Sequence, residues 1–475
     1  MVCDLADLEL SPEEMRAMGA ATLARVVDHL TTLEEQPSMG DLDAEGFCRS
    51  LREPAPEEPT ALEPLLRLLF DECVPRSFTT SGPGYLAFVP GGGLFPAALA
   101  DLIADTTNRF TGMWRTAPAL VQLEANVLAW FAEWMQFPAS ASGLLTTGGS
   151  MASFNAVVAA REKLCGPELR RGVMYASTEV HHAVVKVARL AGVLPDRVRL
   201  LPAREDFTLD PALVEEAVVE DRRRGLLPFL VVSSAGTVNT GAVDPLDAIA
   251  DLCQRHGLWH HVDGAYGAFF HLCPELRGLL RGLPRADSLT LDPHKGLFLP
   301  YGTGALLVRD GAALRAVHAA RAGYLPDVPE PEFYDPSQHG PDLSRGFPGL
   351  RVWLSVKLFG AGKLRAAVAE KRALALDAAA RVGGIPGVVM VAPPSLSLFA
   401  FHLSWPGATL ADENQATQLL LERVCARRRV MLTGCTVRGR LLARVCVLSF
   451  RTRQRHLDTC VEQVAEETAA ILAGR

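Results

Sequence analysis

One lysine has neighbours that suit it to covalent chemistry. The segment Asp292-Pro293-His294-Lys295-Gly296 directly follows a strand-like run that ends at Leu291. A lysine at a strand end, in a loop with proline and glycine, is placed to project into a crevice. Lysine is the side chain that forms imines with aldehydes. A solvated loop lysine is the alternative interpretation, and the neighbouring motifs must decide between the two.

An aspartate ends a second apolar run. The segment from His261 to Tyr266 closes a strand-like stretch and contains Asp263 followed by Gly264 and Ala265. A carboxylate at the end of a buried strand needs a partner. A protonated pyridine nitrogen would satisfy it, and the ion pair would keep that ring an electron sink. The small residues leave room for a flat ring, although Asp263 could also be a simple turn cap.

Three other polar segments could complete such a site. Gly149 and Ser150 open a helical pattern that ends at Leu164, and free N–H groups at a helix N-terminus bind phosphate. Starts of this kind are usually only caps. His181 follows one short strand and could stack on a ring, and Thr237 follows another. Each has a structural alternative, a packed histidine for the first and a turn cap for the second.

The elements that must position these motifs alternate along the chain. Helical patterns at 96–108, 119–135 and 150–164 precede short strand-like runs at 173–176, 197–201, 229–233, 259–262, 288–291 and 305–308. Strands that alternate with helices predict a mostly parallel sheet covered on both faces.

The two ends of the chain have different patterns. Ser11 and Pro12 begin an N-terminal helix with a capping box. After Leu350 come helices at 350–381, 412–427 and 456–472 and strands at 396–403 and 445–450. We expect an N-terminal helical segment at 1–82, a large α/β domain at 83–350 and a small C-terminal α+β domain at 351–475.

Composition narrows the class of protein. The 475 residues are 49% hydrophobic and carry a formal net charge of -7, which argues against nucleic acid as the main partner. The ten cysteines show neither C-x-x-C nor zinc spacing, so we expect reduced thiols and no metal. The first residues lack the pattern of a signal peptide, and no apolar run could span a membrane. A cytoplasmic location is expected.

Together and in this order the motifs match one family. From Pro83 to Phe359 the chain resembles the group II pyridoxal-5′-phosphate (PLP) decarboxylases, which include aromatic-L-amino-acid, glutamate and diaminobutyrate decarboxylases. The likeness extends to Trp114–Pro118, Cys273–Glu275 and Gly346-Phe347. The resemblance implies the PLP-dependent transferase fold of the aspartate-aminotransferase type, an amino-acid substrate, and a homodimer whose active sites lie at the subunit interface.

The resemblance also implies a role for each matching residue. Lys295 would hold the cofactor as a Schiff base, and Asp263 would pair with its ring nitrogen. His181 would stack on the ring near the carboxylate that leaves, with Ala265 packed against the ring and Thr237 near its oxygen. The phosphate contacts would be Gly149, Ser150 and His294. Tyr334, in the proline-rich loop 325–341, resembles a lid tyrosine that returns a proton to Cα, although an exposed loop tyrosine is the alternative.

Three departures from the family pattern leave the substrate open. Gly296 stands where relatives commonly have Trp, Gly91–Gly93 replaces a stretch with a threonine, and Arg115 replaces a small or acidic residue. We expect these positions around the substrate pocket. Arg115 would favour an anionic substrate side chain, unless it forms a surface or interface salt bridge.

The implied reaction is α-decarboxylation of an L-amino acid to an amine and CO2. One rival is another outcome on the same scaffold, either oxidative deamination to an aldehyde or β-elimination. A second is an inactive relative that acts as a binding or scaffold protein, which the intact Lys295, Asp263 and His181 disfavour. A nicotinamide enzyme has no support, because Gly91–Gly93 lacks the G-x-G-x-x-G spacing.

Overall fold

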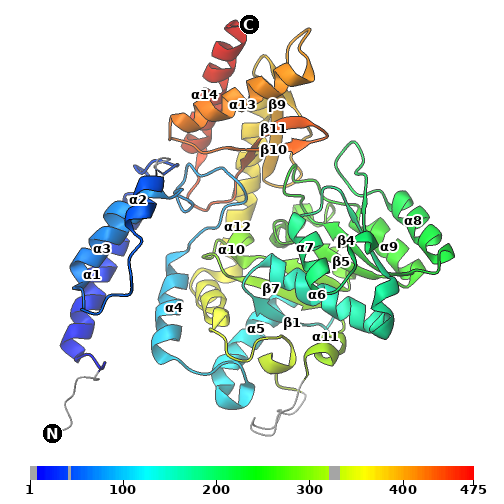
Figure 1. The fold of residues 1–475 in the computed structure, drawn as a ribbon, viewed down its shortest axis with the longest axis horizontal. Helices are drawn as coiled ribbons and strands as arrows, with labels where there is room; N and C mark the ends of the chain where they lie inside the picture. Colours follow the sequence, from blue (N-terminus) through cyan, green and yellow to red (C-terminus); the bar gives the residue numbers. More distant parts are fainter. Residues whose placement is uncertain (1–7, 41–43, 320–331, 475) are drawn as a thin grey trace.

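A seven-stranded sheet forms the centre of the protein (Figure 1). The structure is a computed structural model and describes residues 8–40, 44–319 and 332–474. The strand order is β1-β7-β6-β5-β4-β2-β3. The strands are β1 (Ser142–Thr146), β2 (Gly172–Ser177), β3 (Val198–Leu201), β4 (Leu227–Ser234), β5 (Trp259–Asp263), β6 (Ser288–Leu291) and β7 (Gly304–Val308).

The direction of the strands places the functional loops at one edge. β2, β3, β4, β5 and β6 pair in parallel, and β7 runs antiparallel to both β6 and β1. The carboxyl ends of all strands except β7 therefore lie at the same edge, which is where open α/β sheets bind ligands.

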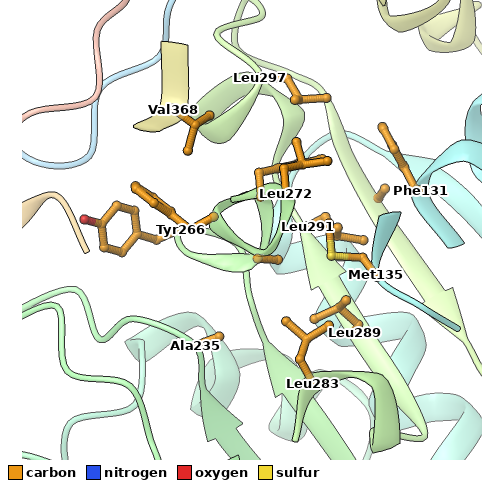
Figure 2. Close-up of a cluster of buried hydrophobic side chains, with 14 of the residues drawn as sticks. Phe131, Met135, Ala235, Tyr266, Leu272, Leu283, Leu289, Leu291, Leu297 and Val368 are labelled. Carbon is orange, nitrogen blue, oxygen red and sulfur yellow. The ribbon is translucent and has the colours of Figure 1, made fainter. Parts of the chain in front are cut away.

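Alternating side chains make both faces of the sheet apolar. On β7, Ala305 and Leu307 join one hydrophobic cluster, whereas Leu306 and Val308 join the other. Figure 2 shows part of the first cluster, in which Leu289 and Leu291 of β6 face Phe131 and Met135. That face is covered by α5 (Pro118–Trp134), α8 (Pro211–Arg223), α9 (Leu246–His256) and part of α12 (Pro348–Gly383), and the other by α6 (Gly149–Leu164), α7 (His182–Leu190) and α11 (Gly311–His318).

A second, smaller sheet follows the large one. Its order is β10-β11-β9-β8, all antiparallel. The strands are β8 (Val388–Met390), β9 (Leu398–Leu403), β10 (Thr433–Val437) and β11 (Arg440–Cys446), and they pack on α13 (Leu410–Ala426) and α14 (Gln454–Ala473). Helix α12 is broken at Gly360 (φ 75°), and its two halves serve the two sheets (Figure 1). This arrangement confirms the predicted fold class.

An N-terminal arm lies beside the body (Figure 1). It contains α1 (Pro12–Thr31), α2 (Glu45–Ser50) and α3 (Leu62–Arg67), and α4 (Phe95–Thr107) follows against α12. The capping box at Ser11 is present, because the Glu14 N–H donates to the Ser11 hydroxyl and the Ser11 N–H donates to the Glu14 carboxylate. Helix α1 buries none of its residues in a single chain. Tyr85 and Leu86 pack with the small sheet, and the domain limits stay a prediction.

Three expectations about local structure were wrong. Strand β1 was missed, because only Gly143–Leu145 are fully buried and the run is short. The dipeptide Asp244-Pro245 predicts an N-cap followed by a first-turn proline, but the N-cap of α9 is Pro245 and Asp244 does not cap this helix. Its buried carboxylate instead accepts the N–H groups of Leu209 and Ser234, at 2.7 Å each. The last strand of the small domain ends at Cys446, so the strand predicted at 445–450 lies earlier. Among the described residues no helix is long and apolar enough to cross a membrane.

Candidate active site

A cavity of about 580 Å³ lies at the carboxyl edge of the large sheet. Its wall is formed by the segments that follow β1, β2, β4, β5 and β6, together with part of 85–89 and Tyr301. The cavity brings together the predicted site residues Gly149, Ser150, His181, Thr237, Asp263, Ala265, His294 and Lys295. Tyr334 is not among the described residues that line it.

Lys295 lies in the cavity and forms an ion pair. It belongs to the one-turn helix α10 (Pro293–Gly296), which starts directly after β6. Its Nζ is 2.8 Å from Oδ2 of Asp292, whose side chain is 2% exposed. The other oxygen of Asp292 is buried and has no hydrogen-bond partner in the described protein. The lysine amine is therefore held at a fixed place beside the cavity by a buried carboxylate.

His294 is fixed in one orientation by the backbone. Its Nδ1 lies 2.8 Å from the carbonyl oxygen of Thr303, which can only accept, so Nδ1 carries the hydrogen. Burial is the main cause that lowers its pKa, and Asp292 works against that effect. Nε2 is 3.6 Å from Asp292. The ring also lies close to Gly148, where an added Cβ would be 3.6 Å from its Cε1.

Among the described residues, one hydrogen bond is made by the Asp263 carboxylate, which lines the cavity. Its Oδ1 accepts the N–H of Ala265 at 3.2 Å, a turn that holds the side chain at the end of β5. Asp263 and Ala265 both line the cavity. The structure thus leaves an anion where a cationic ring edge could bind, next to a residue small enough for a ring.

His181 stands at the start of α7 as a neutral ring. Its Nδ1 accepts the N–H of Ala183 at 3.2 Å, so Nε2 carries the hydrogen in the neutral form. Burial is the largest cause that lowers its pKa, ahead of Asp263, which raises it. His181 is therefore uncharged near pH 7 and can donate from Nε2.

The start of α6 provides an anion cup that has no room for side chains. A Cβ added to Gly149 would lie 3.1 Å from both the Ala265 Cβ and the Asp292 Oδ2. The first N–H groups of a helix lack intrahelical partners and carry the positive end of its dipole. Ser150 adds a hydroxyl at the same place. These features suit a phosphate group.

Thr237 completes the wall from the turn after β4. Its hydroxyl accepts the N–H of Ala242 at 3.1 Å and lies 3.0 Å from the hydroxyl of Thr240. The side chain is buried and lines the cavity. Thr237 therefore stabilises a turn and also borders the space where a ring would lie. The two interpretations of the sequence, a turn cap and a residue near a ring, are compatible.

Tyr334 lies apart from this cavity. Its ring packs on His339 with centroids 4.8 Å apart. Burial and the charge of Glu124 raise the pKa of its hydroxyl, and Arg345 lowers it by a smaller amount. The predicted role as proton donor stays a prediction. Residues 325–331 of the predicted lid lie outside the described residues.

The departures from the family pattern are not all at the pocket. Gly296 is buried, and a Cβ there would be 2.6 Å from the Cβ of Phe269 in the core, so the expectation that it borders the substrate is wrong. Arg115 is exposed and does not line the cavity in a single chain. Gly91 lies at its edge, where its N–H donates to the Tyr301 hydroxyl at 3.2 Å.

Several wall residues were not found from the sequence. Tyr85, Phe88 and Val89 come from one loop, Tyr301 from another, and Met151 from the first turn of α6. Phe88 has φ 50°, an uncommon value for a bulky residue, and is half exposed. Nothing in the spacing of these residues links them. Asp292 is part of the lysine motif but was given no role from the sequence. The signal that could have found it is its spacing of three residues from Lys295.

PLP fits these residues. The structure offers a lysine, a carboxylate for the ring nitrogen, a cup for the phosphate and glycines where the group must lie close to the backbone. The cavity volume is in the range of cofactor sites.

Known proteins share this architecture and much of the sequence. The model of the family described as the pyridoxal-dependent decarboxylase conserved domain matches residues 47–404. An aromatic-L-amino-acid decarboxylase of Bacillus atrophaeus is 32% identical over 94% of each chain. The crystal structure of Oryza sativa TDC with PLP and tryptamine superposes with a TM-score of 0.93 and 27% identity, covering 98% of this chain and 100% of that one. A phenylacetaldehyde synthase of Arabidopsis thaliana is 25% identical over 98% of this chain and 97% of its own.

Proposed function

The chain belongs to the pyridoxal-dependent decarboxylase family and is a PLP-dependent carboxy-lyase, and from this premise we propose that it converts an L-amino acid with a large apolar or aromatic side chain into the corresponding amine and CO2. The observation that carries the proposal is the cavity that joins Lys295, Asp263 and His181. PLP supplies a cationic ring that takes up the electron pair left when CO2 departs.

The residues of this chain divide the work. Lys295 holds the cofactor covalently, and the cup at Gly149 and Ser150 binds its phosphate through free N–H groups. The Asp263 carboxylate keeps the proton on the ring nitrogen, since an anion beside a cation favours the charged form. His181 lies over the cavity as a neutral donor and orients the carboxylate that leaves.

The wall of the cavity supports the choice of substrate. Aromatic and apolar side chains from two loops and from the first turn of α6 border it, namely Tyr85, Phe88, Val89, Tyr301 and Met151. Among the described lining residues, Lys295 is the one lysine or arginine, so an anionic substrate side chain has no fixed cation to bind. Relatives named for aromatic amino acids agree with this choice.

We also propose that the enzyme works as a homodimer. Exposed apolar side chains gather on the arm and on α4, and such patches on one chain mark interfaces. They include Met15, Met18, Leu23, Val27, Leu65, Leu68, Leu69, Leu99, Leu102 and Ile103. Analytical ultracentrifugation should give twice the chain mass, and loss of residues 8–40 should give monomers.

Aldehyde formation is the second candidate. It is favoured by one observation, the likeness to a phenylacetaldehyde synthase over nearly the whole chain. Incubation of PLP-loaded protein with a panel of amino acids separates the two reactions. Amine with CO2 supports the decarboxylase, whereas aldehyde with ammonia supports the alternative.

The decisive test of the site is the identity of the lysine. We expect a visible absorbance band in purified protein that borohydride removes, with the reduced cofactor found on Lys295 by mass spectrometry. Lys371 is the matched control, because its side chain is fully buried but lies in the small domain against Thr452. An adduct on Lys371 or elsewhere, or none on PLP-loaded protein, would refute the proposed site.

A further inference from the structure

We propose that Asp292 is a positioning residue that holds the protonated amine of Lys295 at the cavity wall and thereby controls how fast the protein takes up its cofactor. The inference rests on the proposed function of Lys295. It concerns the protein before PLP is attached and assigns a role to a carboxylate that the proposed reaction does not use.

The geometry singles out this carboxylate. Asp292 directly follows β6 and is 2% exposed, and its Oδ2 lies 2.8 Å from the Nζ of Lys295. Its Oδ1 is buried without a hydrogen-bond partner in the described chain. Elsewhere a buried carboxylate bonds to backbone N–H groups, as Asp244 before α9 does twice. The contact of Asp292 with Lys295 is therefore its main compensation for burial.

Four other ionisable groups surround the pair. His294 approaches from the same short helix at 3.6 Å from Asp292. His181 from the start of α7 and Asp263 from the end of β5 act on the same space, and Cys446 of β11 lies in the field of Lys295. Burial lowers the pKa of both histidines and raises the pKa of the Cys446 thiol to about 12. All three are therefore neutral near pH 7, and Asp292 is the anion in direct contact with the amine.

The ion pair opposes the attachment of PLP. The lysine amine must lose a proton before its nitrogen attacks the aldehyde carbon, and water leaves as the carbon–nitrogen double bond forms. A carboxylate 2.8 Å away attracts the ammonium group and holds it in place. The proton passes to solvent as the ion pair is broken. Asp292 therefore fixes the place of the amine, and their contact must break before the amine reacts.

Asp292 also lies next to the anion cup, which offers a competing explanation. Its Oδ2 would be 3.1 Å from a Cβ on Gly149. A carboxylate here could repel the incoming phosphate, and its removal would then speed loading by another route. Pyridoxal without phosphate separates the two routes, because it has the aldehyde but not the anion.

The experiment measures loading of the full chain after its PLP has been removed with hydroxylamine. Stopped-flow absorbance follows the reaction with PLP and with pyridoxal between pH 6 and 10. In Asp292→Asn we expect about tenfold faster loading of both compounds near neutral pH, because the amine no longer has to leave an ion pair; tenfold corresponds to about 1.4 kcal/mol. Asp310→Asn is the matched control, because Asp310 also pairs with a lysine (Lys163, 2.9 Å) but at the surface.

The outcomes separate cleanly. Equal loading rates in Asp292→Asn and the unsubstituted protein would overturn the inference, as would faster loading with PLP alone, which would assign the effect to the phosphate. If Asp292→Asn does not fold, Asp292→Ser provides the same comparison with a smaller polar side chain. If the unsubstituted protein never links PLP to Lys295, the proposed function fails and the inference fails with it. If it does and Asp292 has no effect, the inference alone fails.

Discussion

The substitution Asp263→Asn separates the charge of the site from its shape. Oδ1 of Asp263 accepts the N–H of Ala265 at 3.2 Å, and the amide oxygen of Asn can accept the same bond. The turn after β5 should therefore persist, and a surface or boundary change of this kind alters stability by about 0.5 kcal/mol or less. What is lost is the negative charge that keeps a proton on the cofactor ring.

The size of the loss follows from the contact that the charge would make. A charged hydrogen bond is about twice as strong as a neutral one, and removing one such electrostatic contact from an active site lowers kcat by about 10²–10³-fold, or about 3–4 kcal/mol. His181 adds nothing to this loss near pH 7. Asp263 raises the pKa of His181, so removing its charge only makes the neutral ring more stable.

The assay combines CO2 release with the absorbance of bound cofactor. We expect a 10²–10³-fold lower kcat with PLP still bound and an unchanged thermal midpoint. Asp287→Asn is the matched control, because Asp287 also accepts a backbone N–H, from His260 at 2.8 Å, but lies outside the cavity. A kcat within about threefold of the unsubstituted enzyme, less than 1 kcal/mol, would refute the reasoning and reduce Asp263 to a turn cap.

The remaining predictions concern proton transfer and pH. Tyr334→Phe should slow amine formation far more than CO2 release and raise the share of aldehyde, because it removes the proposed donor and keeps the ring; unchanged product ratios would place the donor elsewhere, with His181 next. Burial in β5 lowers the pKa of His260 to about 3 and of His261 to about 4. Below about pH 6.5 these two histidines bind protons in the unfolded chain but stay neutral in the folded chain. The free energy of unfolding should therefore fall as the pH is lowered from about 6.5 to 4. We expect a loss of about 2 kcal/mol per histidine at pH 5, measured by urea unfolding, and an equal free energy of unfolding at pH 7 and 5 would contradict it.

Local sequence patterns predicted most of the large sheet because its strands are buried on both faces. Runs such as Phe229–Ser233 are apolar throughout and end in glycine or polar residues, which identifies a parallel strand without any tertiary information. Strand β1 lacks that signal. Its apolar core is only Leu144 and Leu145, and its place in the sheet comes from pairing with β7, more than 150 residues later.

The same limit applies to the candidate site. The strand ends that carry Lys295, Asp263 and His181 could be predicted to meet, because parallel strands place their carboxyl ends at one edge. The surroundings of Gly296 could not be predicted. The space beside it is taken by Phe269, which reaches it from the short 3-10 helix Ala268–Leu272, and no spacing rule connects the two. Arg115 was placed by analogy with its neighbour Trp114, but the single chain leaves it in solvent.

The two carboxylates of the cavity, Asp292 and Asp263, differ in the cation that each would pair with. Asp292 has its cation within the chain, in Lys295, and that ion pair would have to break for the amine to link to PLP. Among the described residues, Asp263 has a backbone N–H as its hydrogen-bond partner, and the ring nitrogen of PLP would supply its cation. Loading of PLP would therefore break an ion pair at the strand end of β6 and form one at that of β5. The two amide variants should therefore act on different steps, with Asp292→Asn speeding cofactor uptake and Asp263→Asn lowering kcat without changing the rate of uptake. Equal effects of the two variants on uptake would mean that the cavity responds to its total charge and not to the place of each carboxylate.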